Sequence, residues 1–306
     1  MRRLAPIVLF VYNRPWHTQQ TLEALFKNEL ADQSMLYIYC DGPKKGESLQ
    51  GLQLIQETRN IVKLRKWAKE VFIIEKEKNA GLGPSITGGV SEVVAQHGRI
   101  IVLEDDLITS PGFLRYMNDA LDHYADNESI MHVSAYWFPV KHSAELLPET
   151  FFFRSSSCWG WGTWQRAWEK LETDCYKLKR HITQMPGGIR RFNIGNSVDH
   201  LGQLENNITG RTNTWAVRWY ATVFLNNGLC LHPHRSLVNN TGFDDSGTHC
   251  DSTTIYHWPQ LAHQIHISPV IQEECQAAVK MLQHFYKTNN GGIASKVKRA
   301  LRRLIQ

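Results

Sequence analysis

The most constraining feature of this sequence is the alternation of short apolar runs with helical patterns between residues 6 and 124. The apolar runs are Pro6–Tyr12, Met35–Cys40, Val71–Glu75 and Arg99–Leu103. Helical spacing of apolar residues follows them in Thr18–Leu30, Leu49–Lys69, Ser85–His97 and Pro111–Tyr124. Alternation of this kind is typical of strands joined by crossover helices. We therefore predict an α/β fold with a mostly parallel, doubly wound sheet flanked by helices.

Polar residues stand where each apolar run stops. Asn13 and Arg14 follow the first run, Asp41 the second, Asn79 the third, and Glu104-Asp105-Asp106 the fourth. The carboxyl ends of parallel strands lie at one edge of a sheet, and ligands bind outside that edge. The sequence thus predicts that four strand ends converge on one ligand-binding crevice.

The acidic triplet is the strongest chemical signal. Adjacent carboxylates repel one another, and burial at a strand end adds to the cost of their charge. A divalent cation would remove that cost, and Mg²⁺ or Mn²⁺ commonly takes one or two carboxylates together with substrate phosphates. The alternative is a solvated acidic turn that caps the following helix. At a strand end beside the other polar residues, we expect a metal site.

Two further strand ends suit a nucleotide. Asp41 precedes Gly42-Pro43 and can accept hydrogen bonds from a base or a ribose hydroxyl; the alternative is a plain Asp-Gly-Pro turn. Asn79 and Gly81 precede a helix, where glycine permits close approach of the backbone and the helix N-terminus attracts phosphate. The alternative for this segment is an ordinary helix start.

The second half of the chain is rich in aromatic residues. Trp159, Gly160 and Trp161 open a Trp-rich stretch that could wall a sugar site, because aromatic faces stack on sugar rings; the alternative is a corner of the core.

Residues 186–213 are expected to form a loop or lid. Residues 236–249 form a polar stretch with Asp244, Asp245 and His249. We expect it to close over a bound donor with His249 as a metal ligand, the alternative being a surface loop with a solvated histidine.

Several of these segments resemble the GT-A fold glycosyltransferases related to N-acetylglucosaminyltransferase I. That family has a Glu-Asp-Asp triplet after a strand, a Val-Ser-Ala-Trp segment some thirty residues later, and a Gly-Leu-Gly-Trp segment after that. The counterparts here are Val102–Ser110, Val133–Tyr136 and Gly160-Trp161. The resemblance extends over roughly residues 5–250 and implies an inverting, metal-dependent transferase that uses a nucleotide-diphosphate sugar such as a UDP-sugar.

The resemblance also implies roles for individual residues. A metal, usually Mn²⁺ and otherwise Mg²⁺, would bridge the donor diphosphate to Asp106. Glu104 and Asp105 would lie on the nucleotide side, with Asp41 near the base. The end of the first strand, at Val11, Tyr12 and Arg14, would also contact the nucleotide.

The family's catalytic base has no direct counterpart here. The family places an Asp between two tryptophans in a Trp-Asp-Asp-Trp segment, whereas this chain has Trp215-Ala216-Val217-Arg218-Trp219, and arginine cannot act as a base at neutral pH. Asp245 is then the first candidate and Asp244 the second, ahead of Glu205 and Asp199. Trp215 and Trp219 would join Trp159 and Trp161 at the acceptor side.

We therefore expect residues 1–268 to form one glycosyltransferase domain, with a donor half at about 1–130 and an acceptor half at about 131–268. The predicted activity is hexosyl or N-acetylhexosaminyl transfer to a glycan, polysaccharide or lipid-linked acceptor. Three alternatives remain: a non-catalytic nucleotide-sugar-binding homologue, which the missing Trp-flanked Asp favours, a nucleic-acid-associated protein, which only the basic C-terminal stretch suggests, and a sugar-phosphate nucleotidyltransferase. The latter usually carries a Gly-rich basic loop where Asn13-Arg14-Pro15 stands.

Net charge and cysteine content limit which partners and which cell compartment we expect. The net charge of +5 is modest and no nucleic-acid-binding motif appears, so no nucleic-acid partner is expected. Six scattered cysteines fit a reducing cytoplasm. Residues 269–306 are expected to form a helical extension whose basic, amphipathic stretch 296–305 contacts the inner face of the membrane; the alternative is a helix packed on the domain.

Overall fold

The computed structural model describes residues 3–244 and 253–290. Its main sheet has the strand order β3-β2-β1-β4-β8-β6-β9-β7. The strands are β1 (Ile7–Val11), β2 (Met35–Cys40), β3 (Glu70–Glu75), β4 (Arg99–Glu104), β6 (Ile130–Ser134), β7 (Thr150–Phe153), β8 (Trp161–Trp164) and β9 (Leu229–Pro233). Strands β3, β2, β1 and β4 pair in parallel, as do β6 and β9, while the pairs involving β8 or β7 are antiparallel. The predicted α/β class with a mostly parallel sheet is confirmed.

A short second sheet and eleven α-helices complete the described chain. The second sheet pairs β5 (Leu107–Thr109) with β10 (Val238–Asn240) in antiparallel fashion. The helices are α1 (Pro15–Phe26), α2 (Leu49–Val62), α3 (Leu82–His97), α4 (Phe113–His123), α5 (Ser143–Leu146), α6 (Gln165–Trp168), α7 (Cys175–Gln184), α8 (Gly188–Phe192), α9 (His200–Ile208), α10 (Ala216–Leu225) and α11 (Gln276–Asn290). A single 3₁₀ turn, η1 (Ala31–Gln33), precedes β2.

The sheet is wound in two directions from β1. The chain passes from β1 to β2 and β3 on one side, then crosses back to β4 on the other side of β1. In the paired register Phe10 of β1 lies beside Glu104 of β4. The carboxyl ends of β1 and β4 therefore meet at the topological switch point, which is the usual ligand position in open α/β sheets.

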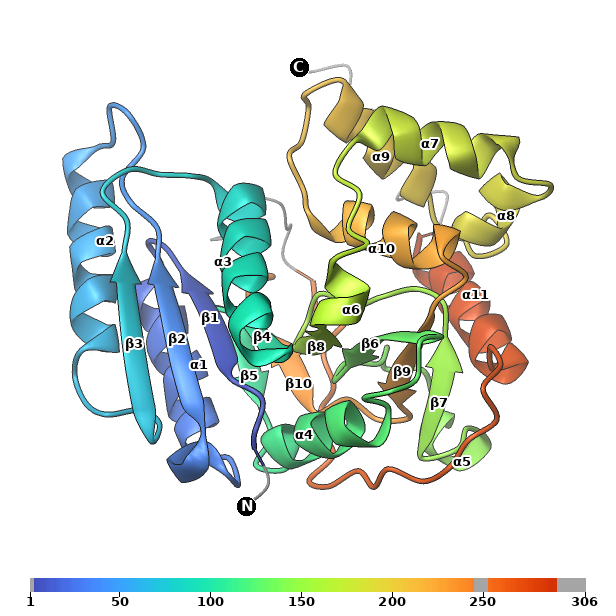
Figure 1. Cartoon of the computed structure of the whole chain (residues 1–306), viewed down its shortest axis with the longest axis horizontal. Helices are drawn as coiled ribbons and strands as arrows, with labels where there is room; N and C mark the ends of the chain where they lie inside the picture. The colour runs from blue at the N-terminus through green and yellow to red at the C-terminus, as the bar shows by residue number, and fades with distance from the viewer. Residues whose placement is uncertain (1–2, 245–252, 291–306) are drawn as a thin grey trace.

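Alternate side chains of β1 face two different cores. Leu9 packs in one core with Leu22 of α1 and with residues of α2 and α4. Phe10 packs in the other with Val90 of α3 and with residues of α6 and α10. Because side chains of a strand alternate between faces, one strand of uniformly buried residues requires helices on both sides. Figure 1 shows α1 and α3 on opposite faces of β1–β4.

Residues 186–213 correct one expectation, because they contain two helices in place of a loop or lid. Phe192 of α8 and Leu204 of α9 are fully buried against α10. Asp199 caps α9, since its Oδ1 accepts a hydrogen bond from the Gly202 N–H at 2.9 Å. The Gly and Asn residues of this stretch lie largely at helix ends and in turns. Figure 1 shows α7, α8 and α9 gathered beside α10.

The start of the C-terminal extension packs on the sheet. Leu282 and Phe285 of α11 are buried against Trp137 and Phe151. The basic stretch 296–305 lies outside the described residues, so its membrane contact stays a prediction. Within the described residues, no helix combines the length and the apolar character that crossing a bilayer requires.

Two adjacent glycines of α3 test how this helix holds β1. A Cβ at Gly89 would lie 2.8 Å from the Phe10 ring, whereas a Cβ at exposed Gly88 would meet nothing within 4 Å. We expect Gly88→Ala to raise the free energy of unfolding by about 0.5–1 kcal/mol, because alanine favours the helix. Gly89→Ala should lower it by about 1–3 kcal/mol through overpacking. Urea denaturation of both variants measures the difference, and equal effects would contradict the close packing of α3 on β1.

Candidate functional site

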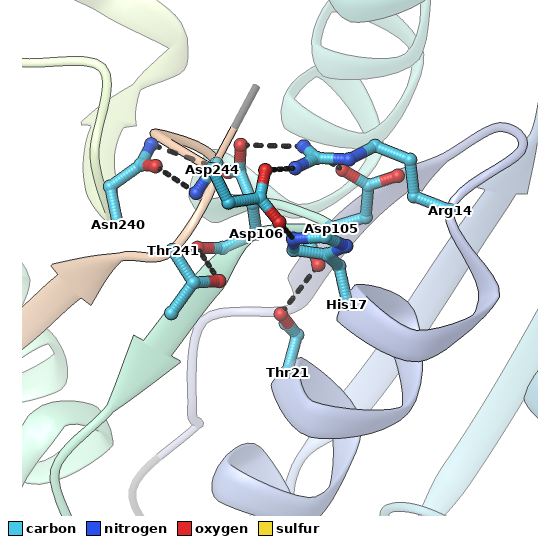
Figure 2. A network of polar contacts seen from close by, with 9 residues as sticks. Arg14, His17, Thr21, Asp105, Asp106, Asn240, Thr241 and Asp244 are labelled. Carbon is cyan, nitrogen blue, oxygen red and sulfur yellow. Dashed lines mark hydrogen bonds and ion pairs between the residues drawn. The ribbon is translucent and has the colours of Figure 1, made fainter. Parts of the chain in front are cut away.

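Three chain segments bring polar side chains to the switch point. Arg14 follows β1 and immediately precedes α1, which begins at Pro15, a favoured first helical residue. Asp105 and Asp106 lie between β4 and β5. Asp244 follows β10, which is paired with β5. Figure 2 shows Arg14, Asp106 and Asp244 directed toward one another from these segments.

The Arg14 guanidinium contacts three carboxylates. Its Nη1 lies 2.9 Å from Asp106 Oδ2 and 3.7 Å from Asp105 Oδ1. Its Nη2 lies 3.6 Å from Asp244 Oδ1. Arginine suits this position, since its planar fork remains charged and can serve several oxygens at once. These three carboxylates carry more negative charge than the single positive charge of Arg14 balances.

Burial and nearby carboxylates raise the pKa of Glu104 and of Asp105. The pKa of Glu104 is raised well above its usual range, first by burial and then by Asp106 and Asp105, against the lowering effect of Arg14. Burial, followed by the charge of Asp106, raises the pKa of Asp105 from 3.8 to about 7, although Arg14 and the backbone N–H of Tyr12 lower it. An added cation would be favourable here, because it would reduce the cost of holding these groups ionised.

The segment after β10 fixes the position of Asp106. The Thr241 backbone N–H and hydroxyl donate to the Asp106 carbonyl oxygen at 2.8 and 3.1 Å. Asn240 Nδ2 donates to Asp106 Oδ1 at 3.4 Å. A Cβ at position 242 would lie 2.1 Å from Asp106 Oδ2, so a side chain there would displace the Asp106 carboxylate from this position. On the other side, the Thr21 hydroxyl donates to the Asp105 carbonyl oxygen at 2.8 Å.

His17 is a site residue that the sequence reasoning missed. Its Nε2 lies 3.0 Å from Asp244 Oδ2, and its side chain is largely buried. Burial and the nearby Arg14 charge lower the pKa of His17, while Asp244 and Asp106 raise it. The available signal was its spacing, because residues three apart on a helix share a face and His17 stands three positions after Arg14. Asn240 and Thr241 were also missed, since only the pairing of β10 with β5 brings them here.

Asp41, Asn79 and Gly81 form a joint between β2 and α3. Asp41 Oδ1 accepts hydrogen bonds from the backbone N–H groups of Gly42 and Ala80, each at 2.9 Å. Its Oδ2 accepts from Asn79 Nδ2 at 2.9 Å and from the Gly81 N–H at 3.1 Å. The structure thus brings these three residues together at the same edge of the sheet. Their contact with a nucleotide stays a prediction.

The end of β1 is held by its own contacts. Val11 is buried, and the Tyr12 hydroxyl donates to Glu47 Oε2 at 2.6 Å. Burial and this hydrogen bond to Glu47 raise the pKa of Tyr12 above its usual value. Tyr12 thereby links the β1 end to the start of α2, while its backbone faces Asp105.

The expected aromatic wall is mostly core. Trp161, Trp215 and Trp219 expose 0%, 4% and 1% of their surface, so their rings offer no face to a ligand. Trp161 and Trp215 stack on each other with ring centroids 5.0 Å apart. Trp159 is half-buried, and its ring centroid lies 4.4 Å from that of Tyr136. Its role at the acceptor side stays a prediction.

Gly160 has a structural reason of its own. Its φ of +63° is rarely adopted by other residues, and a Cβ there would lie 3.0 Å from Val238 Cγ1. This glycine lets the chain turn into β8 directly beneath β10. It therefore supports the strand that leads to Thr241 and Asp244.

The described part of the site offers few donor groups to a metal. Asp245 and His249 lie outside the described residues, and within residues 3–244 and 253–290 no group of three or more His, Cys, Asp or Glu side chains is placed to hold a metal ion. The oxygens of Asp105 and Asp106 are hard ligands with excess negative charge. They fit a cation such as Mg²⁺ or Mn²⁺ that completes its shell with water and phosphate oxygens.

The raised pKa of Asp105 gives a pH prediction. Between about pH 4 and pH 7 the folded chain binds more protons than the unfolded chain, so this residue makes the free energy of unfolding fall as pH rises. Asp105→Asn should remove that dependence and stabilise the fold by about 1–3 kcal/mol at pH 8. Denaturation at several pH values tests this, with exposed Asp126→Asn as the control. A destabilised Asp105→Asn protein at pH 8 would contradict the assigned burial cost.

No family model matches the chain, and no curated protein matches its sequence. Solved structures resemble it distantly. S. aureus TarS 1-349 aligns with 79% of this chain and 62% of its own length at 12% identity and a TM-score of 0.40. Mouse xyloside xylosyltransferase 1 aligns with 72% of this chain and 81% of its own at 12% identity and a TM-score of 0.37. Galactosyltransferase LgtC, solved with donor and acceptor sugar analogues, aligns with 72% of this chain and 70% of its own length at 9% identity and a TM-score of 0.33.

This chain spans 21% of the length of a longer TarS chain, at 14% identity and a TM-score of 0.29. Likenesses this distant assign neither a substrate nor a mechanism.

Proposed function

We propose that this chain is a GT-A fold glycosyltransferase that moves a sugar from a nucleotide-diphosphate sugar to an acceptor hydroxyl, with inversion and with Mn²⁺ or Mg²⁺. The observation that carries the proposal is the position of Asp105 and Asp106, which lie at the switch point between β1 and β4 with excess negative charge. Burial and the charge of Asp106 raise the pKa of Asp105 to about 7. The sequence resemblance of the triplet and its surroundings to known transferases supports the same chemistry. The acceptor class is a glycan, a polysaccharide or a lipid-linked sugar.

Each site residue then has a role. Asp106, with Asp105 beside it, would hold the cation, which when bound neutralises charge on the departing diphosphate. Arg14 balances these carboxylates when no donor is present, and its guanidinium suits phosphate oxygens equally well. Its position between the carboxylates and the end of β1 supports a role in binding the donor diphosphate.

Asp244 is the proposed base among the described carboxylates. It would accept the proton of the acceptor hydroxyl while the hydroxyl oxygen bonds to the anomeric carbon and the bond from that carbon to the diphosphate breaks. His17 and Arg14 orient its two oxygens, at 3.0 and 3.6 Å. These contacts are the reason for proposing Asp244, whereas Asp245, the first candidate from the sequence, lies outside the described residues.

The metal role is tested with Asp106→Asn, which keeps the shape of the side chain and removes its charge. Transfer, followed as nucleoside diphosphate release with Mn²⁺ and a panel of nucleotide sugars, should fall by about 100-fold or more. Thermal shifts produced by donor with Mn²⁺ should disappear in the variant, while Asp126→Asn behaves like the wild-type chain. Near-normal turnover of Asp106→Asn would remove Asp106 from the metal site.

The base assignment is tested by comparing Asp244→Asn with Asp245→Asn. Loss of a general base should lower kcat by about 100-fold while donor binding, measured by calorimetry, stays within a few-fold. We expect this split for Asp244→Asn and a smaller loss of kcat for Asp245→Asn. The opposite order would transfer the role to Asp245, and equal, near-wild-type rates would exclude both residues.

A further inference from the structure

A cavity of about 390 Å³ lies far from the acidic site. Phe153, at the end of β7, lines it together with residues of α8, α10 and α11. Strand β7 is four strands from β4 in the sheet and runs in the opposite direction, as its pairings with β9 and the intervening strands require. The cavity therefore opens at the opposite edge of the sheet from Asp106.

The charges around this cavity do not cancel. Arg154 is paired with Glu274, since the Arg154 N–H donates to Glu274 Oε1 at 3.2 Å and the Arg154 Nε lies 4.0 Å from Glu274 Oε2. The Arg154 side chain also donates to the carbonyl oxygens of Asn227 and Gly228. Arg190 and Arg191 line the same cavity and leave it with a net positive charge.

Two of the polar lining side chains keep their donors available. Within residues 3–244 and 253–290, neither Arg190 nor Gln283 makes a side-chain hydrogen bond or ion pair. The Arg191 guanidinium contacts Met185 Sδ at 3.8 Å, acts electrostatically on Glu274, and lies 5.5 Å from the Phe224 ring centroid. A guanidinium group with available donors, such as that of Arg190, beside an aromatic wall is typical of sites for organic anions.

The cavity wall is also strained. Ile194, Gly195 and Asn196 have consecutive positive φ angles of 48°, 68° and 62°. A β-branched residue in this region is a conformational outlier, and such strain tends to persist where a site requires it. Ile194 lines the cavity from this turn. The Gly195 N–H donates to the Arg190 carbonyl oxygen at 2.8 Å, and this hydrogen bond joins the turn to α8.

We propose that this cavity binds a small organic anion: its phosphate or carboxylate group pairs with Arg190 and Arg191, and its apolar body lies against Phe224 and Ile194. The site is separate from the acidic triplet and does not depend on the function of that triplet. Gln283 supplies a further polar contact for the ligand body.

Calorimetry with the full chain tests the proposal, using phenyl phosphate, benzoate and inorganic phosphate as probes at low salt. We expect saturable binding of an aromatic anion that is tighter than binding of inorganic phosphate and weakens as NaCl is added. Phenyl phosphate binding tighter than benzoate would identify a phosphate ligand, and the reverse a carboxylate. The double change Arg190→Gln and Arg191→Gln should weaken binding by about tenfold or more.

Matched variants keep the test specific. Arg211→Gln removes an equal, exposed charge elsewhere and should leave binding unchanged. Gln283→Ala should weaken binding by about two- to fivefold without a change in net charge. The proposal is overturned if no aromatic anion binds at millimolar concentration, if inorganic phosphate binds as tightly as phenyl phosphate, or if the double variant binds like Arg211→Gln.

Discussion

The contact of Arg14 with the carboxylates after β4 is the interaction on which the candidate site depends. Glu104, Asp105 and Asp106 stand in sequence at a partly buried strand end, where burial and mutual repulsion raise the pKa of Glu104 and Asp105. Arg14 reduces that cost without removing it. The folded chain therefore holds these carboxylates at a remaining electrostatic cost, which the proposed cation would reduce.

Backbone geometry gives this electrostatic centre its shape. The small sheet of β5 and β10 joins the segment after the triplet to a segment more than a hundred residues later, and Thr241 and Gly242 press directly on Asp106. The same pairing delivers Asp244 to His17 and Arg14. Gly160 packs closely against Val238 of β10, where its φ of +63° and a Cβ distance of 3.0 Å to Val238 Cγ1 favour glycine. The second half of the chain thus completes a site that the first half begins.

The Trp-rich stretch shows why residue type alone is a weak guide to function. Trp161, Trp215 and Trp219 could serve equally as a sugar-stacking wall or as core, and local sequence is the same in both cases. The structure buries them in the core beneath α3 and α10. The cavity bounded by Arg190 and Arg191 illustrates the converse. It is formed by a stretch expected to be a loop, and its lining residues come from four separate elements, so no local pattern announced it.

The sequence alone determined the alternating strands and helices of the first half, the parallel sheet and the placement of polar residues at strand ends. These follow from local hydrophobic periodicity and from the rule that parallel strands share a carboxyl edge, so Arg14, Asp41, Asn79 and the triplet were found. Only the tertiary structure decided that His17, Asn240 and Thr241 join them, that the three tryptophans are core, and that residues 188–208 form helices. Those outcomes depend on strand pairing and burial between residues that are distant in sequence. A local sequence pattern carries no information about such contacts.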